Sequence, residues 1–203
     1  MEHLIQTNID LLQWSRSSSD ERLKAVEKII CLIQQDLPLN LSFDMPSGYE
    51  TAFGTYDPVV KQLFINRNQL QQDGISFLWY FLHELRHAIQ YQYHFLFSDI
   101  IQLSLPYVIQ YNGLCFKLQN GQWHSIPLNG SEEYFTELYL CLPYELDANQ
   151  FALNLLQQAS CIEQYSDELK HLQNLWFPKY SCFPEAEAWT HLQTVFHQID
   201  SCL

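Results

Sequence analysis

The sequence has few basic residues: Lys and Arg together number 10, against 23 Asp and Glu, in a chain of 203 residues. A formal charge of -13 repels a phosphate backbone, so we expect neither nucleic-acid binding nor attachment to an anionic membrane. The chain also lacks the basic start and apolar run of an export signal. No apolar run is long and uninterrupted enough to span a bilayer. We therefore expect a protein of the cytoplasm.

The six cysteines include no C-x-x-C pair. They lie far apart, in a chain large enough to fold without disulfide bonds. We expect reduced thiols that pack as small apolar side chains, and no cysteine-based zinc site. The cysteines are Cys31, Cys115, Cys141, Cys161, Cys182 and Cys202.

The sequence is rich in apolar residues: 47% of its residues are hydrophobic and 15% are aromatic. A chain of this length and composition can bury a sizeable core. We predict an α+β fold in a single domain, residues 1–203, with a core at about residues 39–158 and a helical tail at residues 159–203.

The hydrophobic pattern of the first half of the chain predicts helices, then short strands, then a further helix. Residues 20–37 predict an amphipathic helix with Ser19 or Asp20 as N-cap, and a shorter helix is expected at residues 4–14. Alternating stretches at residues 39–43, 51–56 and 59–65 predict a small antiparallel sheet. Residues 73–94 then read as a helix that is apolar nearly all round and therefore buried.

The second half is expected to be mostly helical after a peripheral insertion at residues 95–130. Asn120-Gly121 is the strongest hairpin signal in the chain, between strands at residues 114–118 and 122–126. Apolar periodicity predicts the remaining helices, at residues 131–142, 144–158, 163–175 and 185–199.

The buried helix contains an H-E-x-x-H motif, from His83 through Glu84 to His87. Positions i and i+4 share a helix face, so both imidazoles can reach one ion while Glu84 reaches a water molecule beside it. The spacing therefore supplies two metal ligands and a general base.

A catalytic zinc site takes three protein ligands and keeps one position for water. Tyr93 stands where an extended H-E-x-x-H motif has its third histidine, and His94 lies about 10 Å from His87 along a helix axis. Glu145 is the better candidate, because Ala148 and Ala152 share its helical stripe and allow close packing against the motif helix.

Several features near Glu145 are left open by the sequence. Asn149, one turn later, could orient an imidazole of the site. Weaker alternatives for the third ligand are Asp147, Glu137, Glu133 and His124.

The H-E-x-x-H motif followed by E-x-x-A-N-x-F-A is similar to the zinc peptidase-like domains of the ImmA/IrrE family, within the wider gluzincin group. The resemblance covers about residues 53–156. It implies that His83, His87 and Glu145 bind one catalytic Zn²⁺ ion and that Glu84 activates water. It also implies an active-site helix against a small sheet, whose edge strand, at residues 59–66, can receive an extended peptide.

The expected activity is therefore zinc-dependent hydrolysis of a peptide bond in a peptide or protein substrate. Zinc polarises the scissile carbonyl and acidifies water, and Glu84 moves the proton to the leaving nitrogen. A further donor should stabilise the developing oxyanion. The candidates are Tyr134, Tyr139, Tyr144 and His124.

Two other interpretations use the same motif. In one, the metallopeptidase fold serves as a catalytically silent binding module, of phage or mobile-element origin, whose groove holds a partner protein. In the other, the chain is a DNA-associated protease of the SprT-like kind, which should carry a basic surface. The charge of -13 makes the second the weaker of the two.

Overall fold

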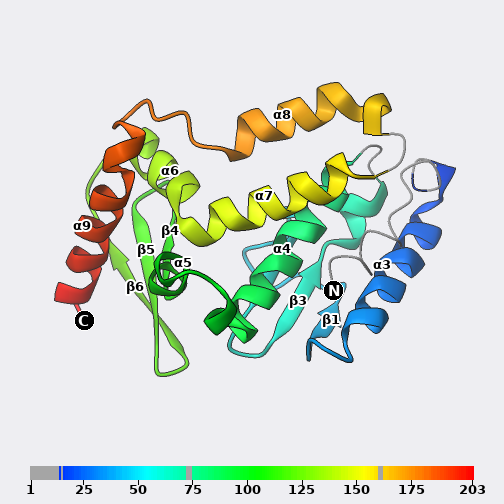
Figure 1. Ribbon diagram of the computed structural model, residues 1–203. Coiled ribbons are helices and arrows are strands. Elements are labelled where there is room, and N and C mark those ends of the chain that lie inside the picture. Colours follow the sequence, from blue (N-terminus) through cyan, green and yellow to red (C-terminus); the bar gives the residue numbers. More distant parts are fainter. Residues whose placement is uncertain (1–13, 15, 72–74, 160–161) are drawn as a thin grey trace. The chain divides into compact units, whose positions relative to one another are not determined.

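The computed structural model describes the chain except for residues 1–13, 15, 72–74 and 160–161. It combines helices with two small sheets, which confirms the predicted α+β class (Figure 1). The helix expected at residues 4–14 lies almost entirely outside the described residues. Two compact units are present, residues 1–92 with 148–175 and residues 93–147 with 176–203. A compact unit need not be a separate domain, so the single-domain assignment stays a prediction.

The first unit opens with α3, Ser19–Ile33, whose N-cap is Ser18, just before the two residues that the sequence favoured. The Ser18 hydroxyl accepts from the Glu21 N–H, and the Glu21 carboxylate accepts from the Ser18 N–H, so the two residues form a capping box. The stripe that α3 buries contains Val26, Ile29, Ile30 and Ile33.

The sheet of this unit has the order β1-β3-β2, with β1 at Asn40–Ser42, β2 at Gly54–Asp57 and β3 at Gln62–Ile65. β2 and β3 are antiparallel as predicted, but β1 is parallel to β3, so the prediction of a wholly antiparallel sheet is wrong. The long connection after β1 carries the chain to the far side of the sheet. The hairpin of β2 and β3 then places β3 between β2 and β1.

The edge strand that the resemblance implied at residues 59–66 is consequently a central strand. In the described part of the sheet, β1 and β2 form the two edges. A hairpin leaves one of its strands outermost, and here that strand is β2.

The motif helix, α4, spans Ser76–Gln92 and packs against β2 and β3 (Figure 1). The same unit contains the 3-10 helix η1 (Arg67–Gln71), most of α7 (Pro143–Gln157), η3 (Ile162–Tyr165) and α8 (Ser166–Trp176), which the unit includes as far as Leu175. The boundary between the units falls inside α7, after Asp147. The helix itself continues without a break.

The second unit is built on the predicted hairpin. β5 (Leu114–Gln119) and β6 (Gln122–Pro127) pair across Asn120 and Gly121, which both have positive φ, as a two-residue hairpin turn requires. β4 (Tyr107–Ile109) adds a third strand that the sequence did not predict. The helical elements are η2 (His94–Leu96), α5 (Asp99–Ser104), α6 (Glu132–Cys141), η4 (Glu185–Glu187) and α9 (Ala188–Ser201).

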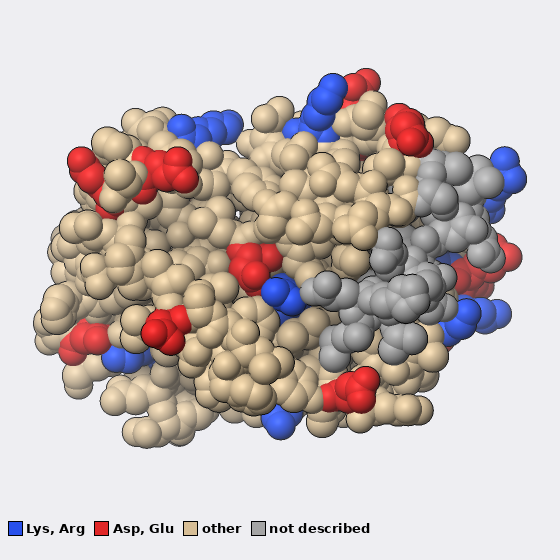
Figure 2. Space-filling model, in the orientation of Figure 1, with Lys and Arg blue, Asp and Glu red and all other residues tan. Residues whose placement is uncertain are grey.

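On the face drawn in Figure 2, the coloured Lys and Arg side chains lie singly and form no continuous basic patch. No helix among the described residues is long and apolar enough to cross a membrane. None of the five cysteines that the structure describes, which exclude Cys161, forms a disulfide bond.

Candidate metal centre

α4 is a rigid support for the motif because most of its surface is buried. Phe77, Leu78, Trp79, Phe81 and Leu82 are each at most 2% exposed. The start of the helix is held by Glu168 of α8, whose carboxylate accepts hydrogen bonds from the N–H groups of Ile75 and Ser76 and from the Ser76 hydroxyl, at 2.8–2.9 Å. A carboxylate at a helix N-terminus satisfies N–H groups that have no partner within the helix.

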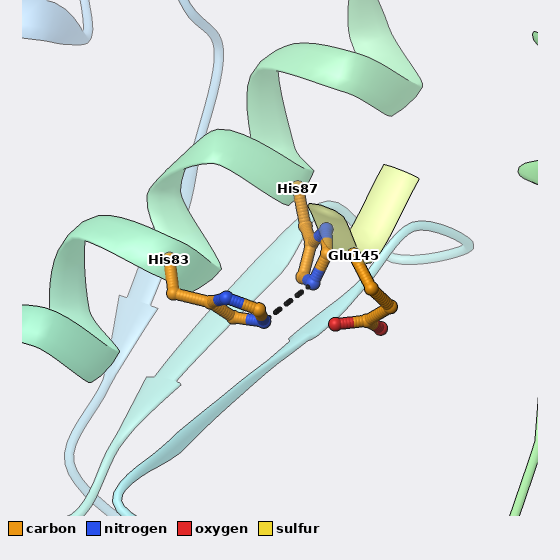
Figure 3. Close-up of side chains that lie close together, drawn as sticks. All are labelled: His83, His87 and Glu145. Atoms are coloured by element: carbon orange, nitrogen blue, oxygen red, sulfur yellow. Dashed lines mark hydrogen bonds between the residues drawn. The ribbon is translucent and has the colours of Figure 1, made fainter. Parts of the chain in front are cut away.

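The two motif histidines point toward one another from successive turns of α4 (Figure 3). Their Nε2 atoms are 2.9 Å apart, and the rings meet nearly at right angles. Both residues are buried, with His83 6% and His87 8% exposed. The i, i+4 spacing therefore brings the two imidazoles together as the sequence predicts.

Each histidine is oriented by a side-chain amide at its other ring nitrogen. His83 Nδ1 lies 2.9 Å from Asn149 Oδ1, and His87 Nδ1 lies 2.8 Å from Gln90 Oε1. An amide oxygen only accepts hydrogen bonds, so an imidazole that donates its Nδ1–H to such an oxygen leaves its Nε2 lone pair available for a metal ion. The two Nε2 atoms face one another, in the arrangement that would let both bind a single ion.

Glu145 joins the histidines from the first turn of α7. The helix is continuous from Pro143, so Glu145 lies one turn before Asn149, which contacts His83. Ligand atoms of His83, His87 and Glu145 all lie within 4.8 Å of one another, and Glu145 is 6% exposed. The three residues thus form a buried group that could hold a metal ion (Figure 3).

The two alanines that the sequence places on the stripe of Glu145 lie in the interior. Ala148 and Ala152 are fully buried. The guanidinium of Arg86 on α4 lies over the ring of Phe151, 4.8 Å from its centroid. One cation–π contact therefore links this part of α7 to the motif helix.

The donor set fits a zinc ion. Two imidazole nitrogens and one carboxylate oxygen are the three protein ligands of a common class of catalytic zinc site. Nitrogens about 2.0–2.1 Å from a tetrahedral zinc ion lie about 3.3 Å apart, so the rings need to separate by only a few tenths of an ångström. A divalent cation would also neutralise the buried Glu145 carboxylate.

Glu84 is half-buried and lies against the first residue of β2. A Cβ placed on Gly54 would approach the Glu84 Cγ to 3.3 Å and the Phe64 carbonyl oxygen to 3.0 Å. Glycine at position 54 therefore gives the Glu84 side chain the room it occupies. No sequence motif points to Gly54.

The structure separates the alternatives for the third ligand. Of the described residues, only Glu145 completes a group of three potential ligands with His83 and His87. Glu137 instead accepts hydrogen bonds from residues 179–181, and Glu133 is exposed. Asp147, two residues beyond Glu145, and His124, on β6, are not part of the group.

The tyrosines singled out in the sequence occupy different environments. The Tyr144 hydroxyl donates to the Tyr107 carbonyl oxygen, and the Tyr134 hydroxyl lies 3.1 Å from His191 Nδ1. Tyr139 donates to Glu145 Oε2 at 3.1 Å. Tyr139 is thus hydrogen-bonded to a member of the group formed by His83, His87 and Glu145.

The sequence motifs do not single out Gln90, although its side chain orients His87. The signal was present, because a residue at i+3 from a helical histidine lies within reach of its ring. On a buried H-E-x-x-H helix, an amide side chain three residues after a histidine is therefore a candidate for orienting that imidazole.

Comparison with known proteins assigns no family to the chain. No protein-family model, curated protein or solved structure matches it. The functional proposal therefore rests on the buried group of His83, His87 and Glu145 and on the two sequence motifs.

Proposed function

We propose that this protein is a zinc-dependent metallopeptidase. The observation that carries the proposal is the buried group of His83, His87 and Glu145, in which the two Nε2 atoms face one another and the Glu145 carboxylate lies beside them. The two amides that orient the rings support it further, because metal-binding histidines almost always donate their second N–H to a protein acceptor.

His83, His87 and Glu145 would hold the ion. When bound, zinc supplies a Lewis acid that polarises a carbonyl and lowers the pKa of water. Glu84 would take the proton of the attacking water on a carboxylate oxygen and deliver it to the amide nitrogen as the C–N bond breaks. Water adds to the carbonyl carbon, so the products are a carboxylate and an amine.

The choice of a peptide bond as substrate rests on the resemblance to zinc peptidase-like domains. The half-buried Glu84 is consistent with it, since the general base must be reached by water and substrate. β2 supports it as well, because it is an edge strand of its sheet, and an edge strand can pair with an extended peptide backbone.

The first test is metal content, measured by elemental analysis of protein purified without chelator or His-tag. We expect about one zinc per chain, lost or much weakened in Glu145→Ala. Glu133→Ala, which removes an exposed carboxylate, is the matched control and should keep the metal. No zinc in the wild type, even after zinc is added at neutral pH, would contradict the proposal.

The second test is peptide cleavage, followed by mass spectrometry on a library of peptides. We expect cleavage by the zinc-loaded wild type and its loss in Glu84→Gln, with zinc retained. Cleavage that continues undiminished in Glu84→Gln would exclude Glu84 as the base. Zinc binding with no cleavage of any peptide, together with capture of an intact partner protein, would favour the silent binding module.

A further inference from the structure

The contact between Tyr139 and Glu145 is built into the junction of α6 and α7. α6 ends at Cys141 and α7 begins at Pro143, so a single residue, Leu142, separates the two helices. Leu142 is fully buried, and its N–H donates to the Tyr139 carbonyl oxygen. The short, buried connection fixes the last turn of α6 relative to the first turn of α7.

Because of this junction, the Tyr139 side chain reaches the carboxylate six residues later. Its hydroxyl donates a hydrogen bond of 3.1 Å to Glu145 Oε2. Tyr139 is half-buried, whereas Glu145 is buried. A hydrogen bond to an ionised acceptor in such surroundings is among the stronger polar contacts in a protein.

The contact has a consequence for how Glu145 can bind an ion. A glutamate can coordinate a metal through one oxygen or through both. Coordination through both oxygens would give the site four protein donor atoms. Coordination through one gives three, which is the number in catalytic zinc sites.

We propose that Tyr139 is a positioning residue that restricts Glu145 to a single coordinating oxygen, by holding the Oε2 atom in a hydrogen bond. This inference rests on the proposed metal function. It adds to that function a residue that sets the number of protein donor atoms. Tyr139 acts through Glu145 and is not itself a ligand.

The test compares Tyr139→Phe with wild type after loading with Co²⁺, whose visible absorption weakens when a fifth ligand atom joins a four-coordinate site. We expect the Tyr139→Phe spectrum to lose intensity, because both Glu145 oxygens become available. We also expect zinc affinity to fall about 10- to 100-fold, as is typical when a group that orients a ligand is removed.

Tyr134→Phe is the matched control. Tyr134 lies on the same helix and loses a contact of the same length, but its partner is His191. This variant should keep the wild-type spectrum and affinity. A Tyr139→Phe protein indistinguishable from Tyr134→Phe in both measurements would overturn the role of Tyr139 while leaving the metal site intact.

A second measurement does not depend on the folding of any variant. X-ray absorption of the zinc-loaded wild type counts the light ligand atoms around the ion. Four atoms, with one carboxylate oxygen, support the proposal, and two carboxylate oxygens would overturn it. Failure of the wild type to bind either zinc or cobalt would overturn the proposed function and, with it, this inference.

Discussion

Gln90 Oε1 lies 2.8 Å from His87 Nδ1, three residues apart on α4, and the Gln90 side chain is fully buried. The motif helix therefore supplies the group that orients one of its own histidines. The other histidine, His83, depends on Asn149 of α7 for the same purpose. One ring is positioned within its helix, and the other by a neighbouring helix.

Replacing Gln90 by Leu should weaken zinc binding about 10- to 100-fold, because His87 loses the acceptor that fixes its tautomer. Gln90→Glu should restore much of the affinity, since a carboxylate oxygen accepts the same Nδ1–H. The measurement is competition for zinc against a chelator of known affinity. Gln92→Leu, on the same helix, removes a hydrogen bond to Tyr56 instead and should bind zinc normally.

Zinc should stabilise the folded protein. A ligand that binds only the folded state adds about 2.7 kcal/mol to the free energy of unfolding when its free concentration is 100 times its dissociation constant. We expect this gain in wild type, by urea unfolding with and without added zinc, and little or none in Glu145→Ala. An equal gain in both proteins would place the stabilising ion elsewhere.

Gly54→Ala should impair catalysis without impairing metal binding. The new methyl group would press on Glu84 and on the carbonyl oxygen of Phe64, at 3.3 and 3.0 Å. A displacement of about 1 Å in a catalytic group can cost roughly 100-fold in rate. Rates on a cleaved peptide, measured alongside zinc content, check this. A variant with full activity would show that Glu84 does not need this space.

Glu137 should make the free energy of unfolding decrease as the pH falls into the acidic range. Burial raises the pKa of its carboxyl group, but hydrogen bonds from the Ser181 hydroxyl and from the N–H groups of Tyr180, Ser181 and Lys179 outweigh burial and lower it below 4.5. The stabilisation is therefore complete above pH 4.5 and is lost as pH falls through the lower pKa of the folded state.

Glu137→Gln tests this dependence. At pH 7 it should cost about 1–3 kcal/mol in the free energy of unfolding, because hydrogen bonds to a buried charged group are lost or weakened. The difference from wild type should shrink as pH falls below 4.5. A difference that stays constant between pH 7 and pH 3 would show that the charge of Glu137 does not matter.

Much of the site could be predicted from the sequence because it depends on spacing within helices. His83 and His87 meet through the i, i+4 relation, and Glu145 with Ala148 and Ala152 forms a stripe that only one face of a helix can present. The turn at Asn120 and Gly121 was equally predictable, since few residues accept positive φ.

Other features depend on contacts between distant segments and left no local signal. The parallel pairing of β1 with β3 is decided by the path of the chain between them, and the periodicity of a strand does not report its direction. The carboxylate of Glu168 at the start of α4 comes from more than 90 residues away. Glu137 likewise reads as an ordinary helix acid until residues 179–181 are placed against it.

Glu145 and Asn149 stand one turn apart on α7, and this pairing has a mechanical consequence. Glu145 offers the ion an oxygen, while Asn149 holds His83 in the orientation that presents its nitrogen. A shift of α7 along or around its axis would therefore withdraw the oxygen and release the imidazole in one movement. Two of the three metal-binding groups would be lost together, so metal binding would depend on the position of this one helix.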